Sequence, residues 1–241
     1  MTRGGAGAAV LALATLGAAS LSAQRPADEA RWREQREALV ARWLEPFGIT
    51  DTATLRAMRT VPRHEFVPRS LRARAYDDAP LPIGLDQTIS QPYVVALMTQ
   101  LVRPRAGMRA LEVGTGSGYQ AAVLAEAGCR VWTIEIFAAL ATQARARLER
   151  LGYGAVAVRH GDGYLGWPEA APFDAILVTA AADSIPPALL AQLAPGGRLV
   201  MPVGDVNAAQ ELVLVEKDER GALRERRVLP VRFVPLLRGI R

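Results

Sequence analysis

The sequence predicts an α/β fold: a Rossmann-like, doubly wound and mostly parallel sheet with helices on both faces, an N-terminal helical cap, and antiparallel strands at the C-terminal edge. Three observations support this prediction. Short apolar segments alternate with helix-patterned segments from residue 105 onward, a glycine-rich turn joins the first apolar segment to its helix, and only a turn separates the last two strand segments. Strands that alternate with helices pair in parallel, whereas strands joined by a tight turn pair antiparallel.

The composition is that of a globular protein. Of 241 residues, 50% are hydrophobic and 22% are charged, which excludes a disordered, collagen-like or disulfide-stapled chain. One cysteine, Cys129, and two histidines, His64 and His160, are too few for a multi-cysteine zinc site and leave little for a histidine-based metal centre. The net charge of +5 comes from arginines scattered among acids, while nucleic-acid binding needs a clustered basic patch. We therefore expect no metal ion, and charge alone does not indicate a nucleic-acid partner.

The N-terminal segment 1–23 is typical of a secretory signal peptide. Arg3 supplies the positive charge, residues 8–19 form a short apolar run, and small residues follow up to Ala23. A membrane span needs about 20 apolar residues, so this run is too short and too rich in alanine to be one. The alternative is an alanine-rich disordered leader. We leave the segment out of the fold, and we expect no membrane span elsewhere.

Residues 24–104 are expected to form a helical cap followed by a loop region. Large apolar side chains recur at helical spacing over residues 27–47, and Gly48 ends that helix. Asp51 is placed to cap a second, short helix.

The loop region leads to a third helix. The stretch 61–84 is rich in proline and polar residues and is predicted to be extended loop. Ser90 precedes an apolar-periodic run that starts at Pro92 and continues to Leu101, so Ser90 is predicted to be the N-cap of a helix.

Residues 105–241 are expected to form the core, packed with residues 24–104 into one compact domain. The predicted parallel strands are 110–113, 131–136, 156–159, 174–179 and 198–202, with helices over 119–127, 138–151 and 186–193. Two further strands, 211–216 and 223–234, are joined by a turn at 218–221 and form the antiparallel edge.

The glycine-rich segment 111–119 is the strongest candidate for a binding loop. Gly114, Gly116 and Gly118 lie where a strand turns into a helix, and glycine there allows a ligand to approach the backbone closely. In open parallel sheets, ligands bind at the carboxyl ends of the strands. The dinucleotide fingerprint needs Gly or Ala three residues after its second glycine, but Tyr119 occupies that position, so a pyrophosphate site is disfavoured. The structural alternative is that these glycines only permit tight packing.

Three acidic residues refine the expected ligand. Glu135 ends the next strand, where a carboxylate can accept the hydroxyls of a ribose. Asp162 and Gly163 end the following strand, where an adenine amine can be bound, and Glu112 adds a carboxylate suited to a cationic ligand. A nucleoside that carries a positive charge and no phosphates is S-adenosylmethionine. Glu135 or Asp162 taken alone would more often be a solvated loop acid, and it is their joint placement after successive strands that favours the cofactor.

Several segments together resemble the protein-L-isoaspartate O-methyltransferase family. The resemblance runs from about Arg36 to Leu236 and covers nearly all of the chain after its leader. The glycine motif is shared by many methyltransferases, whereas the segment containing Gln-Thr-Ile-Ser is far more specific. The matching segments are 61–68, 87–92, 111–119, 161–163 and 173–181.

The resemblance implies a reaction and a set of site residues. Such enzymes transfer a methyl group from S-adenosyl-L-methionine to the free α-carboxylate of an L-isoaspartyl residue in a damaged protein, and the ester then cyclises to a succinimide. By similarity, Ser90 is the active-site serine, while Thr88 and Ile89 shape the same loop. A carboxylate is already ionised at neutral pH, so the reaction needs no general base. The structural alternative for Ser90 is a plain N-cap.

The resemblance also implies partners and a location. We expect isoaspartyl-containing proteins and peptides as substrates, a monomer, and no nucleic-acid partner. Cleavage of the leader would place the protein in the periplasm or outside the cell, whereas the family and the cofactor supply imply the cytoplasm. Asp86 departs from the family pattern, which has glycine before Gln87.

Other functions remain open from the residues alone. A nucleic-acid or other small-acceptor methyltransferase is one, although amino methylation of adenine usually shows Asp/Asn-Pro-Pro-Tyr where this chain has Val-Thr-Ala-Ala at 178–181. A non-catalytic S-adenosylmethionine-binding adaptor is another. An NAD-dependent oxidoreductase is disfavoured by Tyr119 and by the lack of a Tyr–Lys pair near the loop.

Overall fold

The computed structural model describes residues 1, 28–205 and 208–240. The expected signal segment 1–23 therefore lies, apart from its first residue, outside the described residues. No helix among the described residues is long and apolar enough to cross a membrane.

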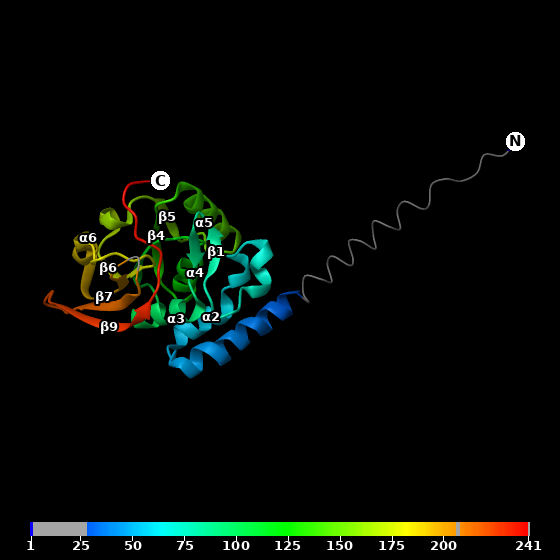
Figure 1. Cartoon of the computed structure of the whole chain (residues 1–241), viewed down its shortest axis with the longest axis horizontal. Coiled ribbons are helices and arrows are strands. Elements are labelled where there is room, and N and C mark those ends of the chain that lie inside the picture. Colours follow the sequence, from blue (N-terminus) through cyan, green and yellow to red (C-terminus); the bar gives the residue numbers. More distant parts are fainter. Residues whose placement is uncertain (2–27, 206–207, 241) are drawn as a thin grey trace.

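A seven-stranded sheet forms the centre of the molecule (Figure 1). Its strand order is β5-β4-β3-β6-β7-β8-β9. The first five strands are parallel to one another, β8 pairs antiparallel with β7, and β9 pairs antiparallel with β8. The doubly wound sheet with an antiparallel edge is thus confirmed. The strands are β3 Arg109–Val113, β4 Arg130–Glu135, β5 Ala157–His160, β6 Phe173–Val178, β7 Leu193–Val203, β8 Gln210–Lys217 and β9 Leu223–Val231.

Side chains of the parallel strands alternate between two hydrophobic cores, one on each face. Ala110 and Leu177 belong to the core that is completed by α2, α3 and α4. Leu111 and Ile176 belong to the other core, which Leu189 of α6 completes. Because both faces are covered, the strands are almost continuously apolar, as parallel strands usually are. The helices are α2 Thr52–Thr60, α3 Pro92–Leu101, α4 Tyr119–Glu126, α5 Ala138–Arg150 and α6 Pro187–Gln192.

The N-terminal cap follows the sequence prediction closely. A helix over residues 28–39 continues through η1 (Val40–Leu44) and η2 (Glu45–Phe47) and ends at Gly48, whose φ of 89° is left-handed. Asp51 caps α2 as expected, since its Oδ1 accepts a 2.7 Å hydrogen bond from the backbone N–H of Thr54. In Figure 1 this cap, in blue, lies alongside α2 and α3.

The stretch 61–84 is more structured than the predicted extended loop. It contains two 3₁₀ helices, η3 (Arg63–Glu65) and η4 (Arg69–Arg74), and then β1 (Leu81–Gly84), which pairs antiparallel with β2 (Gln87–Ile89). Prolines and short 3₁₀ turns have no periodicity that a sequence pattern would reveal.

The β1–β2 turn accounts for the unusual residue before Gln87. Leu85 and Asp86 have φ values of 52° and 56°. Asp tolerates the left-handed region better than most residues, so it can replace the glycine of the family pattern there.

The predicted role of Ser90 as an N-cap is wrong. The N-cap position of α3 is Gln91, whose own side chain does not cap the helix. Instead, Asp78 Oδ1 accepts a 2.8 Å hydrogen bond from the N–H of Tyr93, and Asp78 Oδ2 accepts one of 2.6 Å from Nε2 of Gln91. A carboxylate from outside the helix therefore caps α3. Ser90 was predicted to be the cap because it shortly precedes the helix in the sequence, but its side chain does not take that role.

Strand bounds at the C-terminal half also differ from the prediction. β7 starts at Leu193 rather than at 198, because an irregularity opposite Phe173 lets the Pro-Gly-Gly stretch join the strand. β9 ends at Val231 rather than at 234. The chain then crosses toward the end of β6, where Leu236 N–H donates to the carbonyl of Ala181 at 2.7 Å.

Candidate active site

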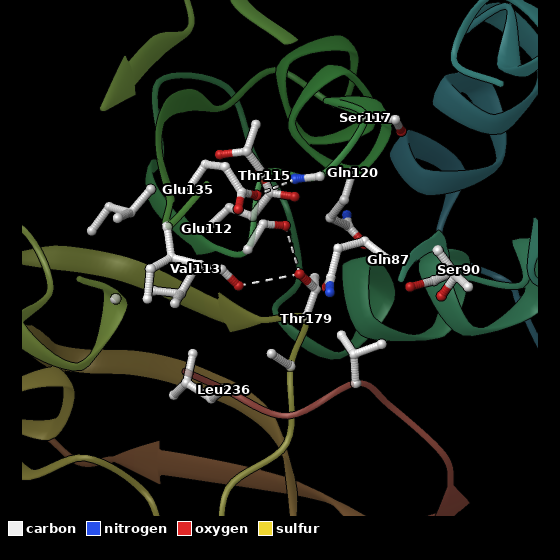
Figure 2. A pocket seen from close by; sticks show the side chains of 18 of the residues that line it. Gln87, Ser90, Glu112, Val113, Thr115, Ser117, Gln120, Glu135, Thr179 and Leu236 are labelled. Atoms are coloured by element: carbon white, nitrogen blue, oxygen red, sulfur yellow. Dashed lines mark hydrogen bonds between the residues drawn. The ribbon is translucent and has the colours of Figure 1, made fainter. Parts of the chain in front are cut away.

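A pocket opens at the carboxyl ends of β3, β4 and β6 (Figure 2). This is the point where the strand order reverses, since β3 leads through α4 to β4 on one side and β6 leads through α6 to β7 on the other. The glycine turn, the β1–β2 hairpin and the C-terminal segment all contribute to its lining. Figure 2 shows Glu112, Glu135, Thr179 and Leu236 around the same hollow, with Ser90 on its hairpin side.

The glycine turn has the geometry that only glycine adopts easily. Gly114, Gly116 and Gly118 have φ values of 100°, 52° and 90°. A Cβ on Gly114 would lie 2.5 Å from Oγ1 of Thr179, and that hydroxyl donates a 2.7 Å hydrogen bond to the carbonyl of Gly114. The turn is therefore fastened to the end of β6 by a contact that leaves no room for a side chain.

Glu112 is fully buried beneath the turn. Its Oε2 accepts a 2.6 Å hydrogen bond from the hydroxyl of Thr133, which in turn is 2.6 Å from the hydroxyl of Thr115. No residue that the structure describes bonds Glu112 Oε1. Burial, opposed by the Thr133 hydrogen bond, raises the pKa of Glu112 to about 8. An unpaired, buried carboxyl oxygen on the pocket wall fits a cationic ligand, whose charge would favour the ionised form.

Glu135 ends β4 and supports the turn from the other side. Its Oε2 accepts a 2.7 Å hydrogen bond from the N–H of Gly116, and its Oε1 accepts one of 3.0 Å from the N–H of Phe137. Each carboxylate oxygen has a second acceptor site, so the side chain can still accept the two hydroxyls of a ribose.

The Asp162 side chain bonds backbone N–H groups outside the pocket lining, whereas its neighbour Gly163 lines the pocket. The oxygens of Asp162 accept from the N–H groups of Tyr164 at 2.9 Å and Gly239 at 3.1 Å, so the side chain caps a 3₁₀ turn and ties down the C-terminal segment. Gly163 lines the pocket, whereas Asp162 is not among the lining residues. A Cβ on Gly163 would overlap Cγ1 of Val113, so the chain passes closely over β3 here.

Ser90 and Thr88 lie between this pocket and a second one. The second pocket runs from the start of α3 to the end of β9, and Thr88, Ser90, Thr179 and Val234 line both. Ile89, buried, lines the first pocket only. The hydroxyl of Ser90 has no hydrogen-bond partner in the part of the chain that the structure describes. It is therefore available to a ligand.

A fully buried arginine holds the backbone of Ser90. Arg63 donates to the carbonyls of Ala75 at 2.8 Å and Ser90 at 2.8 Å, and its guanidinium lies 4.8 Å from the centre of the Tyr119 ring. Burial lowers the pKa of Arg63, but an arginine stays charged in proteins. The sequence interpretation missed Arg63, Asp78, Thr133 and Thr179. Arg63 and Thr179 had a signal, since each lies in one of the segments that carry the family resemblance, whereas Asp78 and Thr133 lie outside those segments.

Both histidines and the cysteine lie away from the pocket lining. His64 stacks on Trp32 with ring centres 4.4 Å apart and bonds the hydroxyl of Tyr76 at 2.7 Å, and burial lowers its pKa to about 4. Cys129 is buried. Within the described residues, no group of three or more His, Cys, Asp or Glu side chains is arranged to hold a metal ion.

Comparison with known proteins identifies the family of this chain. Residues 34–240 match the model of the family described as Protein-L-isoaspartate(D-aspartate) O-methyltransferase (PCMT). The chain is 59% identical over 204 residues to a protein-L-isoaspartate O-methyltransferase of Opitutus terrae, covering 85% of this chain and 87% of that one. A second such enzyme, from Syntrophobacter fumaroxidans, is 60% identical over 189 residues, covering 78% and 76%.

A solved structure is similar over most of the fold. It is a putative protein-L-isoaspartate O-methyltransferase from Plasmodium falciparum in complex with S-adenosyl-L-homocysteine. The TM-score is 0.72 at 25% sequence identity, and the match covers 86% of this chain and 99% of that one.

Proposed function

This chain belongs to the protein-L-isoaspartate(D-aspartate) O-methyltransferase family, and from that membership we propose which of its residues bind the methyl donor and the acceptor. Its activity is protein-L-isoaspartate O-methylation with S-adenosyl-L-methionine as methyl donor, the first step in repair of isoaspartyl residues. One observation carries the assignment of residues: Thr88, Ser90 and Thr179 border both pockets. Donor and acceptor therefore meet at these three side chains.

The first pocket holds the donor. S-adenosyl-L-methionine, when bound, supplies an electrophilic methyl group on a positively charged sulfur. Glu135 would accept the ribose hydroxyls, and Gly163 would line the part of the pocket that takes the adenine. Gly114, Gly116 and Gly118 would let the backbone approach the rest of the molecule, and the unpaired carboxyl oxygen of Glu112 would favour a positive charge in this pocket. Asp162 contributes by holding the backbone around Gly163.

The second pocket holds the acceptor. The α-carboxylate of an isoaspartyl residue is ionised at neutral pH, so no residue has to remove a proton. The unpartnered hydroxyl of Ser90 donates a hydrogen bond to that carboxylate, and Thr88 shapes the same wall. The buried charge of Arg63, bonded to the Ser90 carbonyl, favours an anion here. Catalysis is then mainly orientation, which supplies up to about 7–11 kcal/mol in ideal cases.

Substrates and location form the finer part of the proposal. We propose that the enzyme acts as a monomer on isoaspartyl-containing proteins and peptides. Because its arginines are scattered among acidic residues rather than clustered in one basic patch, we also propose that it does not bind nucleic acid. It is periplasmic or secreted if segment 1–23 is cleaved, and cytoplasmic otherwise. The mass of the protein recovered from fractionated cells decides between these locations.

Two synthetic peptides test the acceptor assignment. They differ only in isoaspartate or aspartate at one position, and each is incubated with the protein and methyl-labelled S-adenosyl-L-methionine. We expect base-labile methanol from the isoaspartyl peptide alone. Label on neither peptide, with cofactor binding still measured by calorimetry, would contradict the proposal and favour another methyl acceptor or a non-catalytic adaptor.

A further inference from the structure

Two aromatic side chains of the N-terminal cap lie exposed next to the second pocket. Trp43 is 46% and Phe47 is 57% exposed, which is unusual for large apolar side chains. Their rings stack with centres 5.9 Å apart and planes inclined by 21°. Phe47 also meets the ring of Tyr93 edge to face, with centres 6.3 Å apart. We name Trp43, Phe47 and Tyr93 the aromatic ladder.

Hydrogen bonds from α3 hold the ladder in place. Gln100 Oε1 accepts from the backbone N–H groups of Thr50 at 2.7 Å and Asp51 at 2.8 Å, while its Nε2 donates to the carbonyl of Gly48 at 3.0 Å. The chain that follows Phe47 is thereby attached to the same helix that carries Tyr93. A surface that is already ordered costs little conformational entropy when a ligand binds to it.

The ladder is continuous with the acceptor pocket. Tyr93 lines the second pocket together with Ser90 and Thr88, and its ring is the member of the aromatic ladder that lies at this pocket. In Figure 1 the cap lies alongside α3, the helix that carries Tyr93. A polypeptide whose carboxylate lies at Ser90 can therefore leave the pocket past Tyr93 and continue over Phe47 and Trp43.

The spacing of the ladder matches an extended polypeptide. In an extended chain, side chains on one face recur every second residue, about 6.6 Å apart. The two ring-to-ring steps of 6.3 and 5.9 Å are close to that repeat. Alternate side chains of such a segment can thus each contact one ring.

We propose that the aromatic ladder binds apolar side chains at alternate positions of the substrate segment that flanks the isoaspartyl residue. This inference rests on the proposed acceptor site at Ser90. Exposed rings remove the most apolar surface from water when they pack against aliphatic or aromatic side chains. A second copy of the chain is disfavoured, because a stable interface needs roughly 800 Å² per partner, and three partly buried rings offer less.

Three isoaspartyl peptides of equal length test the inference. One has only serine and glycine around the isoaspartyl residue, one has leucines at the second and fourth positions on its N-terminal side, and one has them on its C-terminal side. We expect one leucine peptide to have a KM about tenfold lower than the serine peptide, the size of a single well-packed contact. In the double variant Trp43→Ser/Phe47→Ser, the KM for the serine peptide divided by the KM for that leucine peptide should fall from about ten to about one.

Control variants separate the ladder from general effects. Leu223 is also exposed, at 49%, but lies at the start of β9 and lines neither pocket, so Leu223→Ser should keep the tenfold ratio. If the double variant does not fold, Trp43→Ser alone should give a partial loss. Equal KM values for all peptides in the unmodified protein, or a ratio that survives in the double variant, would overturn the inference. Failure to methylate any isoaspartyl peptide would instead overturn the acceptor site itself, and the ladder's role with it.

Discussion

Arg63 Nη2 donates a 2.8 Å hydrogen bond to the carbonyl oxygen of Ser90, although the two residues are 27 positions apart. Asp78 holds the next residues of the same turn, through Gln91 Nε2 and the N–H of Tyr93. The backbone that carries Ser90 is thus fixed from both sides, while the Ser90 hydroxyl has no partner among the described residues. Asp78 should therefore contribute mainly to stability, whereas the Ser90 hydroxyl should contribute mainly to activity.

Ser90→Ala should reduce methyl transfer and leave stability nearly unchanged. A hydrogen bond to a charged group is worth about 1.5–3 kcal/mol, which corresponds to a loss of roughly 10- to 100-fold in kcat/KM. Since the hydroxyl bonds no described residue, we expect the melting temperature to stay within about 1–2 °C of the unmodified value. Initial rates and thermal melting measure both effects. A large drop in melting temperature would mean that the hydroxyl is structural.

Asp78→Ala should show the opposite balance. Loss of an N-cap costs about 1 kcal/mol, which lowers the melting temperature of a protein of this size by roughly 2–4 °C. Asp78→Asn should restore much of this loss, because an amide oxygen can still accept from the N–H of Tyr93. Melting curves of both variants test this, and equal stability of Asp78→Ala and the unmodified protein would show that the cap is unimportant.

The buried carboxyl of Glu112 should make stability depend on pH. Its pKa is raised to about 8 in the folded state, against an ordinary 4.5. The folded state then binds more protons than the unfolded state between these values, so its contribution to stability is complete below about pH 4.5 and is lost as the pH rises toward 8. Glu112→Gln removes this loss. We expect the difference in melting temperature between the variant and the unmodified protein, without cofactor, to grow from pH 5 to pH 8; a constant difference would refute the raised pKa.

Gly114→Ala should weaken cofactor binding. The residue has a φ of 100°, and the added Cβ would lie 2.5 Å from Thr179 Oγ1. Gly152 is a matched control, because its φ is 87° but its Cβ would meet nothing within 4 Å. Both variants should lose about 1–2 kcal/mol of stability from the left-handed backbone, but only Gly114→Ala should also lose affinity for S-adenosyl-L-methionine, measured by calorimetry. If Gly114→Ala and Gly152→Ala bound S-adenosyl-L-methionine with equal affinity, the close contact between Gly114 and Thr179 would not be needed for cofactor binding.

Local sequence patterns are sufficient to predict the secondary structure of the core and the position of the glycine turn. Hydrophobic periodicity reports which side chains are buried, and glycines, Asp51 and Gly48 act on their immediate neighbours. Predictions of this local kind, such as the cap of α2 and the antiparallel edge, were confirmed.

Local patterns do not predict which polar groups form hydrogen bonds and which remain free, because this depends on contacts between distant segments. Asp78 rather than Ser90 caps α3, Asp162 bonds the backbone of Gly239, and Glu112 keeps one oxygen unpaired beneath the turn. The pocket beside Ser90 is likewise lined by the start of α3 and the end of β9, which are far apart in the sequence. A hydrogen bond needs a donor and an acceptor within about 3 Å of each other, and it is packing, not distance in the sequence, that brings such groups together.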